Sequence, residues 1–147
     1  FSKILYPTDF SVLARKALAY VKQLREAGTR EVVVVHVIDS REVNTVARAM
    51  ALYGSKVQQD ADQHIKEKIA QDMDAIAEEL RKTGLAVKTR VKTGIPFTEI
   101  VNIAEEENVS GIVLGSHGVS NVEEMLLGSV SEKVIRKAKV PVLVIKR

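Results

Sequence analysis

The sequence predicts an α/β fold, with one open, doubly wound parallel sheet and helices on both faces. Short apolar segments of strand length alternate with longer amphipathic segments of helix length along all 147 residues, an order typical of parallel sheets. One short segment, residues 31–38, is apolar on both faces except at His36, as expected of a central strand covered from both sides. We therefore expect five strands and four or five helices in a single domain, residues 1–147.

The first part of the chain is predicted to form a strand, a helix and a second strand. Residues 3–7 form the first strand, and Ser11 follows at a position where its hydroxyl can cap a helix. Apolar residues at helical spacing then continue to Leu24, and Gly28 ends the helix. Residues 31–38 form the second strand.

Residues 39–58 have the weakest pattern. They begin with a polar stretch, and residues 43–53 suit a helix that ends at Gly54. We interpret this segment as an insertion or a lid.

A long helix and an edge strand follow. Apolar residues lie on one helical face from Val57 to Leu80, and Gly84 ends this covering helix. Residues 85–92 then alternate between apolar and basic side chains, which indicates a strand with one solvated face at a sheet edge. Basic side chains at an edge discourage pairing with other chains. Those of this strand are Lys88, Arg90 and Lys92.

The last part of the chain supplies two further helices and two strands. Pro96 suits a helix start, residues 111–114 form the fourth strand, and residues 129–132 fit the spacing of a capping box at the last helix. Residues 141–145 form the fifth strand, which has no charged residue. An unprotected apolar edge favours pairing with another chain. The alternative is that this strand is buried within its own fold.

Composition excludes several classes of protein. The chain has 46% hydrophobic and 28% charged residues, as globular domains do, and its apolar runs are too short for a membrane span. It has no cysteine and begins with a strand-like segment rather than a signal peptide, so we expect a cytoplasmic location. The net charge of +3 comes from interleaved basic and acidic residues, which favours a solvated surface over nucleic-acid binding.

Glycines follow the predicted fourth strand and precede the last helix. Gly115 and Gly118 flank a short loop, and Gly128 stands before a helix start, where backbone N–H groups attract anions. Ligands of open parallel sheets bind beyond the carboxyl ends of strands. If the first and fourth strands are neighbours, which right-handed crossovers allow, Asp9 faces the same crevice. We therefore predict a phosphate-binding site there.

The titratable side chains have competing interpretations. Asp9 either binds a base, a ribose or a metal beside phosphates, or it only caps the first helix. His117 either contacts a phosphate or acts as an acid or base, or it is a polar loop residue, which is the commoner case. His36 is expected to be a hydrogen-bonded core residue and His64 a surface residue, so the histidines form no transition-metal site.

Several catalytic motifs are missing. The sequence has no P-loop, no Gly-x-Gly-x-x-Gly fingerprint and no Gly-x-Ser-x-Gly elbow. The lysine that a P-loop places on the outer phosphates is therefore absent. The sequence predicts a site that binds a phosphate ligand rather than one that cleaves it.

The sequence resembles the universal stress proteins over essentially its whole length. The resemblance rests on residues 6–11 (Tyr-Pro-Thr-Asp-Phe-Ser), residues 36–39 (His-Val-Ile-Asp) and residues 141–145. Its most specific part is Gly115-x2-Gly118-x9-Gly128-Ser129, which matches the signature of the ATP-binding branch in spacing and in the terminal serine. Members without these glycines are regarded as non-binders.

This resemblance implies a Rossmann-like fold of the adenine nucleotide alpha hydrolase type, with strand order 3-2-1-4-5. It also implies an adenine nucleotide, ATP or else ADP or AMP, with Mg²⁺ or Mn²⁺ beside it, and homodimers through residues 141–145. The residues implied are Pro7, Thr8 and Asp9 at the adenosine end, the Val37 backbone at adenine, Gly115, Ser116, His117 and Gly118 at the ribose and phosphates, and Gly128, Ser129, Val130 and Ser131 at the phosphate tail.

Three functions are open at this point. The first is a stress-response regulator that binds ATP and has little or no intrinsic hydrolysis. The second is a slow ATP hydrolase in which His117 or Asp9 positions water. The third is an interaction module that binds a partner through residues 39–58.

Overall fold

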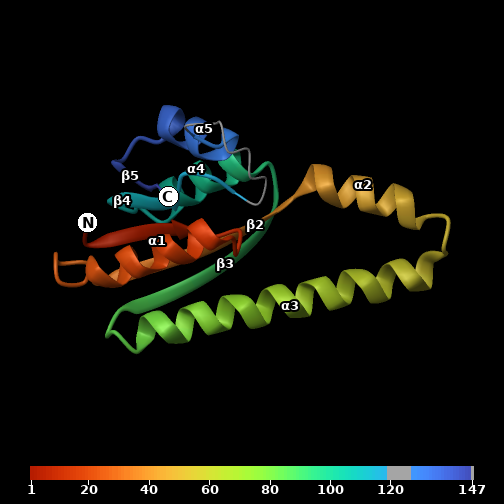
Figure 1. Cartoon of the computed structure of the whole chain (residues 1–147), viewed down its shortest axis with the longest axis horizontal. Helices are drawn as coiled ribbons and strands as arrows, with labels where there is room; N and C mark the ends of the chain where they lie inside the picture. The colour runs from red at the N-terminus through yellow and green to blue at the C-terminus, as the bar shows by residue number, and fades with distance from the viewer. Residues whose placement is uncertain (119–126, 147) are drawn as a thin grey trace.

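The computed structural model describes residues 1–118 and 127–146 and contains one parallel sheet. Its five strands lie in the order β3-β2-β1-β4-β5, and every neighbouring pair is parallel (Figure 1). The strands are β1 (Lys3–Pro7), β2 (Glu31–Asp39), β3 (Ala86–Gly94), β4 (Gly111–Gly115) and β5 (Val142–Ile145). The predicted number, direction and order of the strands are confirmed.

Five helices accompany these strands within the described residues. They are α1 (Val12–Gln23), α2 (Ser40–Met50), α3 (Ser55–Arg81), α4 (Pro96–Glu106) and α5 (Ser129–Lys137). Helix α1 and the C-terminal half of α3 cover one face of the sheet, and α4 and α5 cover the other (Figure 1). The predicted α/β class with helices on both faces is confirmed.

Alternate residues of the central strands supply two separate cores. Val32 and Val34 of β2 contact the α1–α3 side, whereas Val33 and Val35 contact the α4–α5 side. All four side chains are fully buried. Strand β2 is therefore apolar throughout this stretch because both of its faces need apolar surface.

Helix α1 begins where the sequence predicts but ends earlier. The Ser11 hydroxyl accepts a hydrogen bond from Ala14 N at 3.2 Å, so the predicted cap is confirmed. The helix ends at Gln23, and turns lead from there to Gly28, which has a φ of +105°. The predicted helix was too long because the apolar stripe includes Leu24, which packs against the core from the turn.

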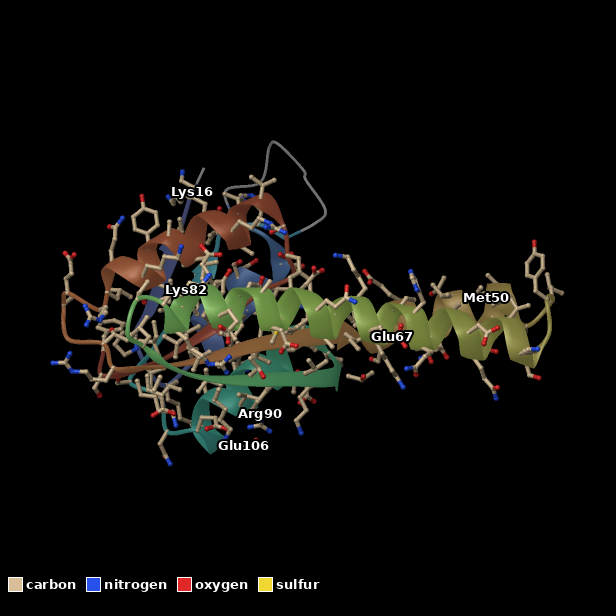
Figure 2. The ribbon with its side chains drawn as sticks, turned by 90° about the horizontal axis from the view of Figure 1, so that it is seen from below. Lys16, Met50, Glu67, Lys82, Arg90 and Glu106 are labelled. Carbon is tan, nitrogen blue, oxygen red and sulfur yellow. The ribbon has the colours of Figure 1, made fainter. Side chains whose placement is uncertain are left out.

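Residues 39–58 form most of a helical hairpin, in which the helix predicted for residues 43–53 is present as α2, residues 40–50. Asp39 ends β2 and caps α2, since its Oδ1 accepts a hydrogen bond from Arg41 N at 2.9 Å. Helix α2 and the N-terminal half of α3 project beyond the sheet, and we call this projection, residues 40–68, the arm (Figures 1 and 2). The arm extends away from the sheet instead of folding over its edge as a lid does.

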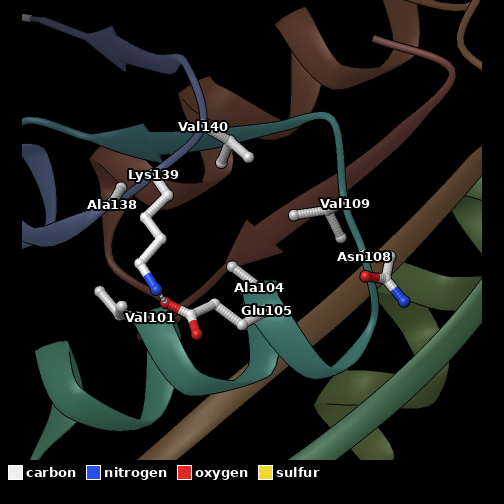
Figure 3. A pocket seen from close by; sticks show the side chains of 8 residues that line it. All are labelled: Val101, Ala104, Glu105, Asn108, Val109, Ala138, Lys139 and Val140. Atoms are coloured by element: carbon white, nitrogen blue, oxygen red, sulfur yellow. Dashed lines mark ion pairs between the residues drawn. The ribbon is translucent and has the colours of Figure 1, made fainter.

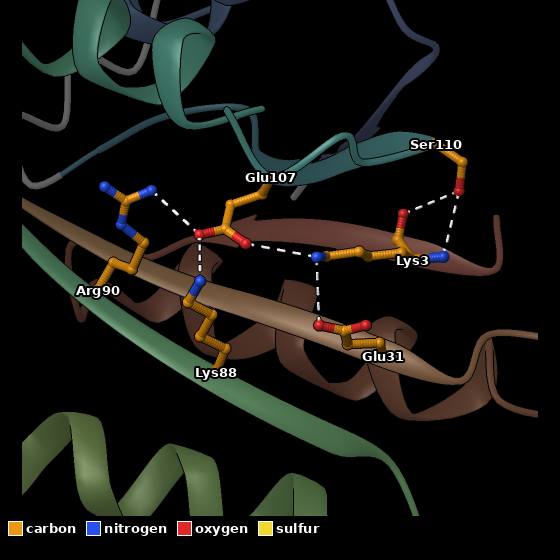
Figure 4. Close-up of polar contacts among 6 residues, drawn as sticks. All are labelled: Lys3, Glu31, Lys88, Arg90, Glu107 and Ser110. Atoms are coloured by element: carbon orange, nitrogen blue, oxygen red, sulfur yellow. Dashed lines mark hydrogen bonds and ion pairs between the residues drawn. The ribbon is translucent and has the colours of Figure 1, made fainter. Parts of the chain in front are cut away.

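An ionic cluster on the α4 side of the sheet is centred on Glu107 (Figure 4). Its carboxylate pairs with Lys88 at 2.6 Å, Arg90 at 3.1 Å and Lys3 at 3.3 Å. The hydrogen bond from Lys88, with support from Lys3, lowers the pKa of this carboxyl below its usual value. Strand β3 is an edge strand, as predicted. However, Lys88 and Arg90 stabilise the fold through this cluster instead of standing free at the edge.

Strand β5 forms the opposite edge of the sheet. Within the described residues it pairs with β4 alone, and Leu143 is 37% exposed. The strand begins at Val142, one residue later than predicted. The alternative that this strand is buried within its own fold is therefore wrong.

Candidate functional site

The loop after β1 is a turn fixed by hydrogen bonds. Thr8 N donates to Val35 O at 2.8 Å, which continues the β1–β2 ladder into the loop. Phe10 N donates to Thr8 Oγ1 at 3.1 Å, and Ser11 N donates to Asp9 Oδ1 at 3.0 Å. Because Ser11 caps α1, Asp9 is not the helix cap. Its Oδ1 instead orders the turn, and its Oδ2 lies toward Gly118.

His36 holds this loop from the neighbouring strand. Its Nδ1 donates to Thr8 O at 2.8 Å, and its ring packs against the Phe10 ring with centroids 4.6 Å apart. Phe10 has a φ of +63°, which is rare for a bulky residue and persists only where surrounding contacts hold it. The expected hydrogen bond is present, but His36 is half-buried rather than a core residue. The sequence did not indicate that its partner is the loop after β1.

Asp9 and Gly118 meet at the carboxyl ends of β1 and β4. A Cβ atom at Gly118 would lie 2.8 Å from Asp9 Oδ2, closer than real Cβ atoms approach other groups. Strands β1 and β4 are neighbours in the sheet, so the two loops lie next to each other. Any side chain at position 118 would have to displace the Asp9 carboxylate.

Gly115 and Gly128 also stand where two backbone segments approach closely. A Cβ atom at Gly115 would lie 3.1 Å from the carbonyl carbon of Leu13 in α1. At Gly128 it would lie 3.2 Å from both His117 Cα and Ser116 O. None of the glycines of the signature has a positive φ. The sequence therefore needs glycine at these positions for close packing of the loops rather than for a left-handed turn.

Helix α5 begins without a side-chain cap at the place where the loops after β1 and β4 meet. We call this place, with Asp9, Gly115, Gly118 and Gly128, the junction. Its N-cap is Gly128, so the capping box predicted for residues 129–132 is wrong, because Ser129 is already the first helical residue. The buried Ser131 hydroxyl donates to Gly115 O at 2.8 Å and ties the helix to the loop after β4. An uncapped helix start offers its first N–H groups to an anion, and the exposed Ser129 adds a hydroxyl.

Only the backbone groups of Val37 and Val130 are available to a ligand, because their side chains pack into the core. Both side chains pack against the core on the α4–α5 side. Pro7, the last residue of β1, pairs with Val35, whose carbonyl is directed toward β1. Because backbone groups alternate sides along a strand, the N–H and C=O of Val37 point the same way, beyond the end of β1. Val130 N belongs to the first turn of α5.

Ser116 and His117 connect the loop after β4 to its surroundings. Ser116 is buried; its N donates to Ile145 O at 2.9 Å, and its carbonyl accepts a hydrogen bond from Gly128 N at 2.7 Å. The Ser116 hydroxyl lies 2.9 Å from His117 Nδ1. Ser116 is thus part of the framework, whereas the half-buried His117 ring lies beside it on the loop.

Tyr6 supports the junction from the core. Its hydroxyl donates to Ala14 O at 2.6 Å and so fixes the first turn of α1 against β1. Burial raises the pKa of Tyr6 to about 12. The phenol therefore remains a neutral hydrogen-bond donor throughout the physiological pH range.

A separate pocket of about 330 Å³ lies between α4 and the segment before β5 (Figure 3). The ion pair between Lys139 and Glu105, 3.0 Å long, lies along it. Its lining residues are Val101, Ala104, Glu105, Asn108, Val109, Ala138, Lys139 and Val140. None of them belongs to the predicted nucleotide site, so this pocket is a different feature from the glycine-lined junction.

No group of three or more His, Asp or Glu side chains suited to a metal ion is found among residues 1–118 and 127–146. None of the helices in these ranges is long and apolar enough to cross a membrane.

Comparison with known proteins agrees with the fold. A model of the universal stress protein family matches residues 1–146. A universal stress protein of Methanocaldococcus jannaschii is 43% identical over 155 residues, which cover 100% of this chain and 96% of that protein. The solved structure of that protein has a TM-score of 0.88 to this one over the same shares of the two chains.

Two further solved structures contain nucleotides. A universal stress protein from Archaeoglobus fulgidus in complex with dAMP is 25% identical, with a TM-score of 0.65 over 99% of this chain and 98% of that one. A universal stress protein in complex with cAMP is 18% identical and shares the fold, with a TM-score of 0.66 over 99% of this chain and 97% of that one. From the match along its length and the 43% identity, this chain belongs to the universal stress protein family.

Proposed function

We propose that this chain is a regulatory protein that binds an adenine nucleotide, with ATP as the expected ligand. The observation that carries the proposal is the contact of Asp9 with Gly118 beside the uncapped start of α5. A hydrogen-bond acceptor and an anion-binding helix end thus lie at one edge of the sheet. A nucleotide presents groups suited to both, since its ribose hydroxyls donate hydrogen bonds and its phosphates are anionic.

The proposed orientation of the nucleotide follows from the positions of the Val37 backbone and of the first N–H groups of α5. Adenine would lie against the Val37 backbone beyond the end of β1, with Asp9 and Thr8 at the adenosine end. The phosphates would lie over Ser129 and the first N–H groups of α5. The relatives solved with dAMP and cAMP hold adenine nucleotides, which supports adenine as the base.

A divalent cation would be held mainly by the phosphates of the nucleotide. No cluster of three acidic or histidine side chains lies among the described residues. Mg²⁺ commonly binds through substrate phosphates, water and one or two carboxylates. Asp9 is the carboxylate that the structure places at the junction, so it is the residue we would test for a cation contact.

We propose that the protein binds ATP without hydrolysing it efficiently. A P-loop lysine is absent from the sequence, and the His117 ring lies against the Ser116 hydroxyl. The competing proposal, a slow hydrolase, requires His117 or Asp9 to position water. If turnover of ATP is unchanged in both His117→Ala and Asp9→Ala, neither residue serves that role.

We further propose homodimers that pair through β5. The supporting observation is that β5 lies at the sheet edge, with Leu143 partly exposed and no charged residue within the strand. Edge strands of this kind are available for pairing with a second copy. Sedimentation of Leu143→Lys against the wild type tests this interface.

Isothermal titration with ATP, ADP and AMP, each with and without Mg²⁺, tests the nucleotide proposal. We expect saturable binding of at least one of them, and mass spectrometry of the native protein should identify any nucleotide that co-purifies. The absence of binding to all three would overturn the proposed function. Binding of GTP with equal affinity would overturn the assignment of the base.

A further inference from the structure

The apolar stripe of α3 is longer than the core that it covers. Met73 and Leu80, in the C-terminal half, are buried in the α1–α3 core. Val57 and Ile65 lie on the same stripe but are 47% and 48% exposed. The reason is that α3 runs past the end of the sheet, so its N-terminal half has no strand beneath it (Figure 2).

Helix α2 does not cover the remaining part of this stripe. No residue of α2 is buried, and its own apolar residues Val43 and Val46 have exposures similar to those of α3. At the tip of the hairpin, Leu52 is 89% and Tyr53 is 74% exposed. The arm is therefore a pair of amphipathic helices whose apolar sides have too few partners within the chain. Two-helix hairpins of this kind are completed by further helices.

The charges of the arm indicate what kind of partner fits. The arm, residues 40–68, contains five basic and four acidic residues, and Asp39, at the end of β2, pairs with the first of the basic ones. The basic residues are Arg41, Arg48, Lys56, Lys66 and Lys68, and the acidic ones are Glu42, Asp60, Asp62 and Glu67. A surface on which the two signs nearly balance does not attract a polyanion such as nucleic acid. It is, however, complementary in charge to a second copy of itself.

We propose that the arms of two copies pack against each other as an antiparallel four-helix bundle related by a two-fold axis. In such an interface the same patch of both copies makes the contact, so one hairpin supplies both halves of the core. The antiparallel direction follows from the shape of the molecule. The arm projects from a sheet and its covering helices, which together are broader than the arm (Figure 1). Parallel arms would bring two of these bodies into collision.

This interface is separate from the edge at β5. The arm connects β2 to β3, which lie on one side of the sheet order, and β5 lies at the other end. A substitution at one surface should therefore leave the other intact. The arm interface is short, about 20 Å along its helices, so we expect a dimer that depends on protein concentration.

Sedimentation equilibrium of the full chain tests the proposal, in a Leu143→Lys background that removes the proposed β5 contact. We expect a monomer–dimer equilibrium in this background. Val46→Glu with Ile65→Glu should raise its dissociation constant about tenfold or more. Gln59→Glu, at an exposed polar position of α3, should leave that constant unchanged. A Leu143→Lys protein that is monomeric at all concentrations would overturn the proposal.

Cross-linking identifies the surface and the direction directly. The chain has no cysteine, so a single Ala61→Cys substitution near the middle of the arm provides one reactive thiol. In an antiparallel pair this position lies near the two-fold axis and should form a disulfide with its copy under mild oxidation. Glu26→Cys, on the turn after α1, is the matched control and should not. Equal disulfide formation by both variants would contradict the arm interface, even in a protein that dimerises.

Discussion

The glycine-lined junction and the arm differ in how tightly the residues of a single copy of the chain pack together. At the junction, a Cβ atom at Gly118 would lie within 2.8 Å of Asp9, and Gly115 and Gly128 are nearly as tightly surrounded. On the arm, Val57 and Ile65 are nearly half exposed and α2 has no buried residue. Among the described residues, the first region is closely packed within one copy of the chain and offers backbone donors, the Asp9 carboxylate and the Ser129 hydroxyl to a ligand. The second region is unfinished in one copy, which is why we propose a small ligand for the first and a second chain for the second.

The largest expected effect is at the junction. Gly118→Val should weaken nucleotide binding at least about 100-fold, or about 2.7 kcal/mol, because the new side chain displaces the Asp9 carboxylate. Gly118→Ala should have a smaller effect in the same direction. Titration calorimetry measures both, and thermal denaturation should show little change because position 118 is exposed.

The same variant separates the two regions. If the junction and the arm are independent, Gly118→Val leaves the association of the arms unchanged. A parallel loss of nucleotide binding and of dimerisation would mean that the variant disturbs the whole fold and that the junction and the arm are not independent.

The second effect concerns the ionic cluster that stabilises the body of the molecule. Glu107→Gln should destabilise the protein by about 2 kcal/mol, because the charge-assisted bonds from Lys88, Arg90 and Lys3 lose their acceptor charge. Glu67→Gln on the arm is the matched control, and its effect should stay within about 0.5 kcal/mol. Urea denaturation measures both changes.

The pH dependence of stability follows from the same residue. Hydrogen bonds from Lys88 and Lys3 lower the pKa of Glu107 in the folded state, so its contribution is fully present above the ordinary pKa of this carboxyl in the unfolded chain, 4.5. This contribution is lost progressively as the pH falls below the unfolded pKa and through the lower folded pKa. Glu107→Gln should therefore flatten the loss of stability below pH 4.5 relative to the wild type. If the stability of Glu107→Gln falls with decreasing pH as steeply as that of the wild type, Glu107 does not contribute to this pH dependence.

A smaller effect is expected for His36. His36→Leu removes the hydrogen bond to Thr8 O and should lower nucleotide affinity about tenfold, or about 1.4 kcal/mol, by loosening the loop that carries Asp9. His36→Asn places an amide N–H near the position of Nδ1 and should retain most of the affinity. If both variants bind equally weakly, ring packing against Phe10 rather than the hydrogen bond positions the loop.

The smallest expected effect on the monomer is at the tip of the arm. Tyr53→Ser should change the free energy of unfolding by less than about 0.5 kcal/mol, since the side chain is largely exposed. It should leave nucleotide affinity unchanged. A larger loss of stability in a dilute, monomeric sample would show that the tip is packed within its own chain and that the arm is not an open surface.

The sequence predicted much of the junction but not its details. The spacing of Gly115, Gly118 and Gly128 indicated an anion site, and the strand order brought Asp9 to it. The capping box was wrong because a hydroxyl one residue inside the helix has the same local spacing as a true cap. The role of His36 was also missed, because its partner is 28 residues away and no local pattern records that contact.

The sequence by itself determined the α/β class, the number of strands and the edge at β3, because these depend on apolar periodicity and turn residues that act over a few neighbouring positions, whereas the edge at β5 was decided by the structure. Tertiary structure alone decided that the signature glycines serve close packing, since the atoms they make room for belong to Leu13, Asp9 and the loop after β4. It also decided that residues 40–68 project as an arm. An apolar stripe has the same period whether or not a sheet lies beneath it, so the stripe of α3 gave no sign of where the core ends.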